Sequence, residues 1–374
     1  MHQPPRILFA GGGTGGHVYP AIAIADAVRE LEPKAVIAFA GTTRGLEWKA
    51  VPAAGYEIHE ITVSGFKRSF STENLSFPFK LLKGMKQSFE LVSGFRPMVG
   101  VGTGGYVSGP VMRAATLKQC PVVIQEQNAF PGKTNLLLSR HASEIHIAFP
   151  EARDRFKGRE CKLSGNPIRA TLATADRNDG LEHFGIEDGK MVVFMFGGSG
   201  GSGAMNEIML SKIDQILSRE EIVMIWQTGD RYYDSIASQV QQHPRLKLLK
   251  YVDRMDLAYS VTDLAVCRSG AITCSELALT GTPAVLVPSP NVAEDHQTYN
   301  ARSLSDAGAA VLVAESDLSE QLVDLIHGMI ADSVKRLAMS KRATERAYPK
   351  AATTIAESVL AVAAQNAGGQ HAQA

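Results

Sequence analysis

The feature that most constrains this chain is a glycine-rich turn that occurs twice, each time between a short apolar run and a helical pattern. The turns lie at residues 11–16 and 197–203, and both fit the spacing G-x-G-x-x-G. An apolar run that enters such a turn and continues into a helix is typical of a β-α unit with a parallel strand. The glycines that fit the spacing are Gly11, Gly13 and Gly16 in the first turn and Gly198, Gly200 and Gly203 in the second.

Short apolar runs alternate with amphipathic stretches along the chain, which predicts an α/β fold with parallel sheets. Because the pattern restarts at the second turn, we expect two domains, at residues 1–167 and 168–349, with a helix at about 350–365 that packs back on the first. Residues 366–374 are expected to be a disordered tail. Strands are expected at residues 6–10, 35–40, 97–102, 121–125, 144–148, 190–196, 222–227, 246–249, 264–267 and 284–287, and helices at 18–30, 204–217 and 353–364.

Composition agrees with a two-domain globular protein and excludes several classes. The 374 residues exceed what one hydrophobic core usually supports. Basic and acidic residues number 38 each, so the net charge gives no reason to expect a nucleic-acid partner. The four cysteines form no C-x-x-C pair, which favours reduced thiols in a cytosolic protein over a zinc site. We expect neither a signal peptide nor a membrane-spanning segment, because no suitable apolar run occurs.

Glycine turns of this kind suit a diphosphate, because the backbone comes close to the ligand and the following helix presents free N–H groups. The alternative is a tight strand-to-helix turn without a ligand. A dinucleotide would also require an acidic residue at the end of the second strand, and Thr42 and Thr228 stand near those ends instead. A Walker A loop is excluded because Gln127 occupies the place of its first glycine before Gly132 and Lys133.

Seven segments, two of which contain the glycine turns, together and in this order resemble the MurG family of bacterial glycosyltransferases. The resemblance implies the glycosyltransferase-B fold, with two Rossmann-like domains whose parallel sheets face each other across a cleft. It implies UDP-N-acetylglucosamine as donor, the undecaprenyl-diphosphate-linked muramoylpentapeptide (lipid I) as acceptor and lipid II as product. The segments are GGGTGGHVYPAIAIA at 11–25, GTGGYVSGP at 102–110, EQNAFPGKTN at 126–135, GNPIR at 165–169, GGSGGSGAMN at 197–206, CRSGAITCSEL at 267–277 and DHQTYNA at 295–301.

The resemblance also implies a donor site, and we expect no metal or other cofactor there. The chain contains no D-x-D motif, so the leaving diphosphate would be neutralised by the second glycine turn and by an arginine. Glu276 would accept hydrogen bonds from the ribose, although base rates for glutamate favour a solvated helix acid. The implied donor-site residues are Asn128, Arg169, Ser199, Val252, Ala271, Ile272, Thr273, Cys274, Ser275, Glu276 and Gln297.

For catalysis the candidate general bases are His17 and Glu126. The positive end of the following helix favours a neutral His17 imidazole, which suits a base, but a capping or orienting histidine fits the position equally. The alternative for Glu126 is a structural carboxylate that accepts hydrogen bonds from backbone N–H groups. The lipid diphosphate is expected at the first-domain loops, on Gly13, Thr14, Gly15, Gly16, Gly104, Gly105 and Tyr106.

Residues 65–86 mix phenylalanines and leucines with five basic residues, which fits peripheral binding to the cytoplasmic leaflet of the cell membrane. A buried helix with a solvated basic face is the alternative. Competing functions on the same fold are a UDP-N-acetylglucosamine 2-epimerase and a diacylglycerol glycosyltransferase. A non-catalytic nucleotide-sugar-binding module and a dinucleotide oxidoreductase are further alternatives, the latter weakened by the missing ribose acid.

Overall fold

The computed structural model describes residues 3–63 and 77–371 of the chain, which divide into two compact units. The N-terminal unit comprises Met1–Ile168 and Lys350–Ala374, and the C-terminal unit comprises Arg169–Pro349. Of the segment suggested for membrane contact, residues 65–76 lie outside the described residues. Within the described ranges, no helix has both the length and the apolar character needed to cross a membrane.

The N-terminal unit is built on a seven-stranded parallel sheet in the order β3-β2-β1-β4-β5-β6-β7. The chain moves outward from β1 to β2 and β3 and then returns to the other side of β1, so the strand order reverses between β1 and β4. The strands are β1 Arg6–Gly11, β2 Val36–Gly41, β3 Glu57–Glu60, β4 Val99–Gly104, β5 Val122–Glu126, β6 Glu144–Ile147 and β7 Lys162–Leu163.

Helices cover both faces of this sheet because alternate side chains of each strand point to opposite faces. Ile7 and Phe9 of β1 pack with one group of helices, and Leu8 and Ala10 pack with the other. The first group contains α1 and α14, and the second contains α3, α4 and α5. The helices are α1 Gly15–Leu31, α2 Glu47–Ala53, α3 Phe77–Phe95, α4 Gly105–Leu117, α5 Lys133–Leu138 and α14 Ala351–His371.

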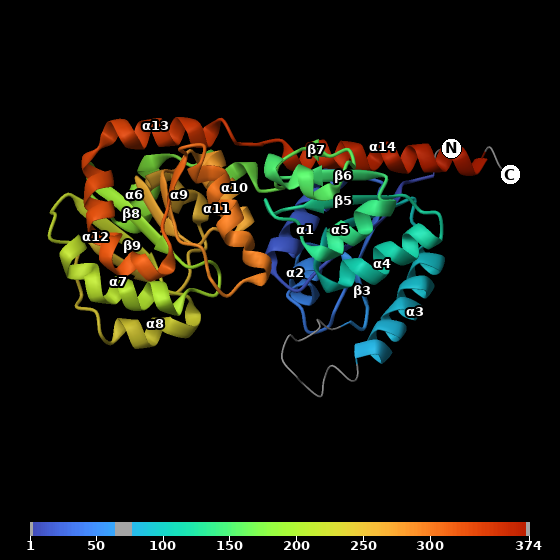
Figure 1. The fold of residues 1–374 in the computed structure, drawn as a ribbon, viewed down its shortest axis with the longest axis horizontal. Coiled ribbons are helices and arrows are strands. Elements are labelled where there is room, and N and C mark those ends of the chain that lie inside the picture. The colour runs from blue at the N-terminus through green and yellow to red at the C-terminus, as the bar shows by residue number, and fades with distance from the viewer. Residues whose placement is uncertain (1–2, 64–76, 372–374) are drawn as a thin grey trace. The chain divides into compact units, whose positions relative to one another are not determined.

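The last helix, α14, returns from the end of the chain to the N-terminal unit (Figure 1). Ile355 and Val359, one helical turn apart, are fully buried against α1 and β1. The helix continues to His371, past residue 366, where the tail was expected to begin. One cause is the side chain of Asn366, whose amide donates a hydrogen bond to the carbonyl of Met98 at 2.9 Å.

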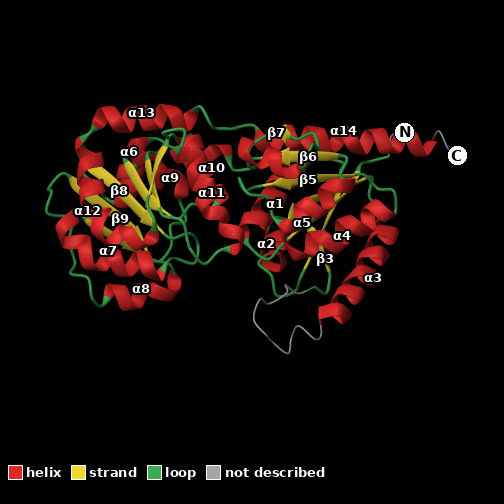
Figure 2. Cartoon of the chain, in the orientation of Figure 1, coloured by secondary structure: helices red, strands yellow, loops and turns green. Residues whose placement is uncertain are grey.

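The C-terminal unit repeats the plan with a six-stranded parallel sheet in the order β10-β9-β8-β11-β12-β13, flanked by helices (Figure 2). Its order reverses between β8 and β11. The strands are β8 Met191–Phe196, β9 Ile222–Gln227, β10 Leu246–Leu249, β11 Leu264–Cys267, β12 Ala284–Leu286 and β13 Ala310–Leu312. The α-helices are α6 Arg177–Phe184, α7 Gly203–Ile216, α8 Asp230–Ala237, α9 Met255–Val261, α10 Ala271–Thr280, α11 His296–Ser305, α12 Glu315–Ala331 and α13 Ser333–Thr344.

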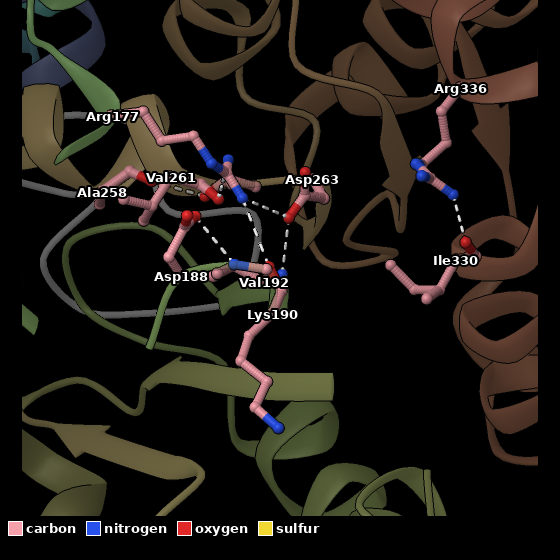
Figure 3. Close-up of polar contacts among 11 residues, drawn as sticks. Arg177, Asp188, Lys190, Val192, Ala258, Val261, Asp263, Ile330 and Arg336 are labelled. Carbon is pink, nitrogen blue, oxygen red and sulfur yellow. Dashed lines mark hydrogen bonds and ion pairs between the residues drawn. The ribbon is translucent and has the colours of Figure 1, made fainter. Parts of the chain in front are cut away.

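One ionic contact fastens the first helix of this unit to the base of its sheet. Arg177, at the start of α6, donates to the carboxylate of Asp263 at 3.1 Å and to the carbonyl of Val261 at 2.8 Å. The same carboxylate accepts the N–H of Val192 at 2.7 Å, as Figure 3 shows. Asp263 directly precedes β11, so its contacts connect α6 to the amino ends of β8 and β11. The loops at the opposite, carboxyl ends of these two strands carry the candidate site.

Candidate active site

The sequence-predicted site residues collect at the two places where the strand order reverses. In a parallel sheet such a switch point sends neighbouring helices to opposite faces, and the loops there are the usual ligand-binding place. In the N-terminal unit these places are the carboxyl ends of β1 and β4, at residues 11–14 and Gly104. In the C-terminal unit the loops follow β8 and β11, and they carry residues 197–202 and 268–270.

Two helices begin without a side-chain cap at the N-terminal switch point. Thr14 before α1 and Gly104 before α4 make no capping hydrogen bond from their side chains. The first N–H groups of a helix have no partner inside the helix, so the N-termini of α1 and α4 create a positive electrostatic potential that favours an anion. Gly105 has a φ of +80°, and a Cβ there would lie 2.2 Å from the carbonyl oxygen of Gly12, so the two loops touch.

Gly13, predicted for the acceptor diphosphate, already has a partner within the unit. Its N–H donates to Oε2 of Glu47 at 3.0 Å, and the other carboxylate oxygen accepts the N–H of Thr42 at 2.9 Å. Burial acts to raise the pKa of Glu47, but the hydrogen bonds from Gly13 and Thr42 outweigh it and lower the pKa. A diphosphate would thus meet a carboxylate at Gly13. The starts of α1 and α4 are the better place, and sequence reasoning missed Glu47.

His17 lies in the first turn of α1, with its ring beside the loop after β4. Its Nδ1 is 2.9 Å from Oε1 of Gln127, and its main-chain carbonyl accepts the hydroxyl of Thr103 at 2.8 Å. A Cβ on Gly104 would lie 3.0 Å from the same Nδ1, so the ring is packed against this glycine. The histidine that the sequence singled out is therefore held on two sides at the uncapped helix starts.

Glu126 is 1% exposed and its two carboxylate oxygens accept four hydrogen bonds. Oε1 accepts from the N–H of Asn128 at 2.9 Å and from its side-chain amide at 3.2 Å. Oε2 accepts from the N–H of Gly132 at 3.1 Å and from the amide of Asn135 at 2.9 Å. These contacts favour the structural interpretation of Glu126 over the general base, and they place Asn128 beside it.

The glycine turn of the C-terminal unit is held by contacts with residues at the end of β9, and its tip is exposed. Gln227, at the end of β9, donates to the carbonyl of Gly198 at 3.1 Å. Gly201 has a φ of +71°, and a Cβ there would lie 2.0 Å from the carbonyl oxygen of Thr228. Ser199 and Gly200 lie at the exposed tip, where an added Cβ on Gly200 meets no atom within 4 Å. The tip is therefore free to face a diphosphate.

Arg268 is a residue of this site that sequence reasoning missed. It is 9% exposed and donates to the hydroxyl of Ser202 at 2.7 Å. It also donates to the carbonyls of Val287 and Pro288, each at 3.1 Å, and pairs with Glu315. Because Ser202 caps α7, this guanidinium joins the glycine turn to the ends of β11 and β12. The available signal was a charged residue directly after a buried strand.

The start of α10 supplies a second set of predicted residues. Gly270 precedes Ala271 without a side-chain cap, and the Cys274 side chain is fully buried, which leaves only its backbone for a ligand. Glu276 accepts the hydroxyl of Tyr259 at 3.0 Å. Burial raises the pKa of Glu276 to about 7, against the lowering effects of Tyr259 and of the Arg169 charge. Arg169 therefore lies near enough to Glu276 for its charge to act on the carboxyl group.

Two further predicted residues are connected to these loops by side-chain amides. The N–H of Val252 donates to Oε1 of Gln227 at 3.0 Å, so the same glutamine holds Val252 and the glycine turn. Oε1 of Gln297 accepts the N–H of Ser289 at 2.8 Å, and its main-chain carbonyl accepts the hydroxyl of Ser269 at 2.9 Å. These contacts use the N–H of Val252 and the side-chain oxygen of Gln297, and not the Val252 carbonyl or the Gln297 NH₂ group.

Two parallel α/β units, each with a glycine turn at its switch point, define the class of glycosyltransferases with the B fold, and comparison with known proteins makes this specific. Residues 7–147 match the glycosyltransferase family 28 N-terminal domain, and residues 192–355 match the family 28 C-terminal domain. The chain belongs to glycosyltransferase family 28.

Several curated proteins with similar sequences share the same name. A Salinibacter ruber protein is 51% identical over 96% of this chain and 98% of its own length, and is named UDP-N-acetylglucosamine–N-acetylmuramyl-(pentapeptide) pyrophosphoryl-undecaprenol N-acetylglucosamine transferase. The crystal structure of Acinetobacter baumannii MurG superimposes with a TM-score of 0.79 at 29% identity, covering 96% of this chain and 99% of that one.

A UDP-GlcNAc 2-epimerase from Neisseria meningitidis, solved with UDP-GlcNAc, superimposes with a TM-score of 0.66 at 12% identity, covering 95% of this chain and 99% of its own. That likeness shows a shared fold alone. The predicted fold class, the resemblance to the MurG family and the prediction of a UDP-sugar glycosyltransferase are thus confirmed. The epimerase and the diacylglycerol transferase are not favoured as alternatives.

Proposed function

We propose that this chain transfers N-acetylglucosamine from UDP-N-acetylglucosamine to lipid I, the undecaprenyl-diphospho-muramoylpentapeptide, and so forms lipid II. The observation that carries the proposal is the 51% identity, over nearly the full length of both chains, with a protein named for that reaction. The loops at the two switch points supply suitable chemistry, because each unit offers a place for a diphosphate.

In the C-terminal unit, the donor diphosphate would bind at the tip of the glycine turn, around Ser199 and Gly200, where α7 presents its N-terminus. Arg169 would add a bidentate cation for the leaving phosphate. Glu276 would accept the ribose hydroxyls, and the backbone of Val252 would contact the uracil. The start of α10 at Ala271 would lie along the nucleotide, and Gln297 would bind sugar hydroxyls.

In the N-terminal unit, the lipid diphosphate would bind the uncapped starts of α1 and α4, at Thr14, Gly15, Gly16, Gly105 and Tyr106. His17 would then accept the proton of the attacking sugar hydroxyl. The hydroxyl oxygen forms a bond to the anomeric carbon while the bond from that carbon to the UDP oxygen breaks. UDP leaves with the electron pair, and the configuration at the anomeric carbon inverts.

A transfer assay tests this function directly. The protein is incubated with radiolabelled UDP-N-acetylglucosamine and a lipid I analogue, with and without EDTA. We expect label in the lipid fraction in both conditions, since the charge on the leaving UDP is assigned to Arg169 and a helix N-terminus. Release of UDP without labelled lipid, or epimerisation of the donor, overturns the proposal.

We further propose that the enzyme works at the cytoplasmic leaflet of the cell membrane, through the surface of α3. On this helix Leu81 is 42% exposed and Leu82 is 68% exposed, and Lys80, Lys83 and Lys86 accompany them. Apolar side chains with basic neighbours favour an anionic lipid surface. We expect the protein to float with anionic vesicles in a density gradient. A variant in which Leu81, Leu82, Lys80 and Lys83 are all replaced by Gln should remain in the bottom fraction. Full flotation of that variant contradicts this surface.

A further inference from the structure

We propose that Gln127 is a positioning residue that fixes the tautomer of His17, so that Nε2 carries the lone pair that receives the acceptor proton. The inference rests on the proposed role of His17 as general base. Its physical basis is a buried amide whose orientation is determined by its own neighbours. Gln127 is 1% exposed, and its Oε1 lies 2.9 Å from Nδ1 of His17.

The orientation of the Gln127 amide follows from the atoms around its nitrogen. Nε2 lies 2.8 Å from the carbonyl oxygen of Thr103, 3.1 Å from the carbonyl oxygen of Gln125 and 2.5 Å from Oε1 of Gln125. All three neighbours are oxygens, so this end of the amide must be the NH₂ group, whose two hydrogens they share. Reversing the amide would place its own oxygen against these three and leave a buried oxygen without a donor, which is costly.

The neighbouring side chains hold this orientation in turn. Gln125 is fully buried, and its NH₂ group donates to Oδ1 of Asn166 at 3.1 Å, which directs its own Oε1 to Gln127. Asn166 donates from its amide to the main-chain carbonyl of Gln127 at 3.1 Å. The three side-chain amides therefore form a chain of donors and acceptors that is anchored at the main-chain carbonyl of Gln127, and the orientation of each amide fixes that of the next.

The tautomer of His17 follows from the amide. An amide oxygen only accepts, so Nδ1 of His17 must carry the hydrogen of the 2.9 Å contact. A neutral imidazole has one N–H, so Nε2 is left with a lone pair. When Nε2 gains a proton, the Nδ1–H bond to Gln127 persists. The packing of the ring against Gly104 and the bond from Thr103 to the His17 carbonyl keep the imidazole in this place.

The partner of His17 is a neutral amide, and this affects the chemistry. A carboxylate at this distance would favour the charged imidazolium, which has no lone pair to offer. The amide orients the ring without that charge effect. Gln127 is also too deeply buried to reach a substrate, so its contribution is made through His17.

The tautomer can be measured on the free protein by ¹⁵N NMR with labelled histidine, using His17→Gln to assign the signal. In the wild type, at a pH where the ring is neutral, we expect a protonated Nδ1 and a bare, pyridine-type Nε2. Gln127→Met removes the acceptor with little change of shape, so the Nε2–H form, which free imidazole side chains prefer, becomes dominant. The same variant should lower kcat about 10²-fold with donor KM changed less than about threefold, because base catalysis contributes on the order of 10²–10⁴.

Gln125→Met is the matched control, since it removes the same group from the same network without touching His17. We expect it to keep the Nδ1–H tautomer, because the carbonyls of Thr103 and Gln125 still hold the Gln127 amide. An unchanged tautomer in Gln127→Met, or a changed tautomer with unchanged kcat, overturns the inference. Failure of the wild type to glycosylate lipid I would instead refute the proposed function, and the NMR result would still stand on its own.

Discussion

The hydroxyl of Tyr259 donates a hydrogen bond to Oε2 of Glu276 at 3.0 Å, which joins helix α9 to helix α10. Tyr259 is 3% exposed, so this bond holds the carboxyl group from its buried side. Burial raises the pKa of Glu276 to about 7, and the Tyr259 bond and the Arg169 charge act in the opposite direction. The group assigned to the donor ribose therefore titrates at physiological pH in the free protein.

Donor affinity should consequently depend on pH around 7. Ribose hydroxyls donate to the carboxylate, so the donor prefers the ionised form of Glu276. Below pH 7 the free protein must first lose a proton, and the Kd for UDP should increase about tenfold for each unit of pH. Calorimetric titration with UDP between pH 5.5 and 8.5 measures this. Glu276→Gln should bind UDP about 10- to 100-fold more weakly at pH 8, through loss of a charged acceptor.

The Glu276→Gln variant is also the control for titration of the phosphates of UDP, which is the same in both proteins. Tyr259→Phe should shift the midpoint of the wild-type dependence to higher pH, because the Tyr259 bond lowers the pKa of Glu276. If wild type and Glu276→Gln show the same pH dependence, Glu276 does not bind the ribose.

Two adjacent glycines of the donor turn should respond differently to alanine. Gly201→Ala places a Cβ 2.0 Å from the Thr228 carbonyl at a φ of +71°, so it should lower the melting temperature. Gly200→Ala meets no protein atom within 4 Å, so its stability should match the wild type. A diphosphate that approaches the backbone at Gly200 would meet the new methyl group, and UDP affinity should fall about tenfold or more. Unchanged UDP binding in Gly200→Ala would remove the diphosphate from this tip.

How far the sequence predicts this fold depends on how strongly each strand is buried. Strands β1 and β8 are nearly continuous apolar runs, because both faces of a parallel sheet are covered, and their positions were predicted to within a residue. The edge strand β3, with the sequence EIHE, the two-residue β7 and the edge strand β13 were not predicted. Short edge strands such as β3 and β7 need little hydrophobicity, so their sequences resemble loops. β13 is apolar, but it is shorter than the runs of roughly four to eight residues that predict a strand.

The site shows the same division between local and long-range information. The glycine turns and His17 were predictable, because strand, turn and helix start are neighbours in the sequence. Glu47 and Arg268 were not, because their partners Gly13 and Glu315 lie 34 and 47 residues away. A buried charged residue is recognisable in a sequence only when its partner is close by. The amide network behind His17 spans β4, β5 and the loop at Asn166, and only the sheet brings these together.

The buried guanidinium of Arg268 should be important for both stability and donor binding. Arg268→Met leaves Glu315, whose side chain is 22% exposed, without its cation, and leaves Ser202 without its donor. We expect a loss of about 2–3 kcal/mol of unfolding free energy for the C-terminal unit. That corresponds to a decrease in melting temperature of roughly 4–12 °C by calorimetry.

The double variant Arg268→Met/Glu315→Met tests the cause of that loss. Replacing both partners removes the unpaired carboxylate, so part of the lost stability should return. UDP binding should stay weak in both variants, because neither restores the contact that holds Ser202. If the double variant is as unstable as Arg268→Met, the loss comes from the carbonyls of Val287 and Pro288 and not from Glu315.

A polar cluster should add to the apolar packing that holds the last helix, α14, to the N-terminal unit. Ser358 of α14 donates to Oε2 of Glu144, and Lys162 pairs with Oε1 at 2.8 Å. The buried His146 lies 3.3 Å from the same carboxylate. Ser358→Ala removes a hydrogen bond to a charged group and should cost about 1.5–3 kcal/mol of stability at pH 7.

The pH dependence of that cost has a definite sign. Burial acts to raise the pKa of Glu144, but the Lys162 and Ser358 contacts outweigh it, so its pKa is lowered from 4.5. The stability that Glu144 provides is therefore present above pH 4.5 and is lost as the pH falls through the lowered pKa. Burial lowers the pKa of His146 from 6.5, so stability also declines as the pH falls below 6.5, in wild type and variant alike.

Urea unfolding of both proteins at pH 7 and at pH 3.5 separates the two effects. The gap between wild type and Ser358→Ala should be largest at pH 7 and should shrink at pH 3.5, as protonation of Glu144 removes the charge that strengthens the Ser358 bond. Ser316→Ala, whose hydroxyl pairs with Asp317 at an exposed position of the other unit, is the matched control and should be neutral. An equal gap at both pH values would show that Ser358 acts through packing and not through Glu144.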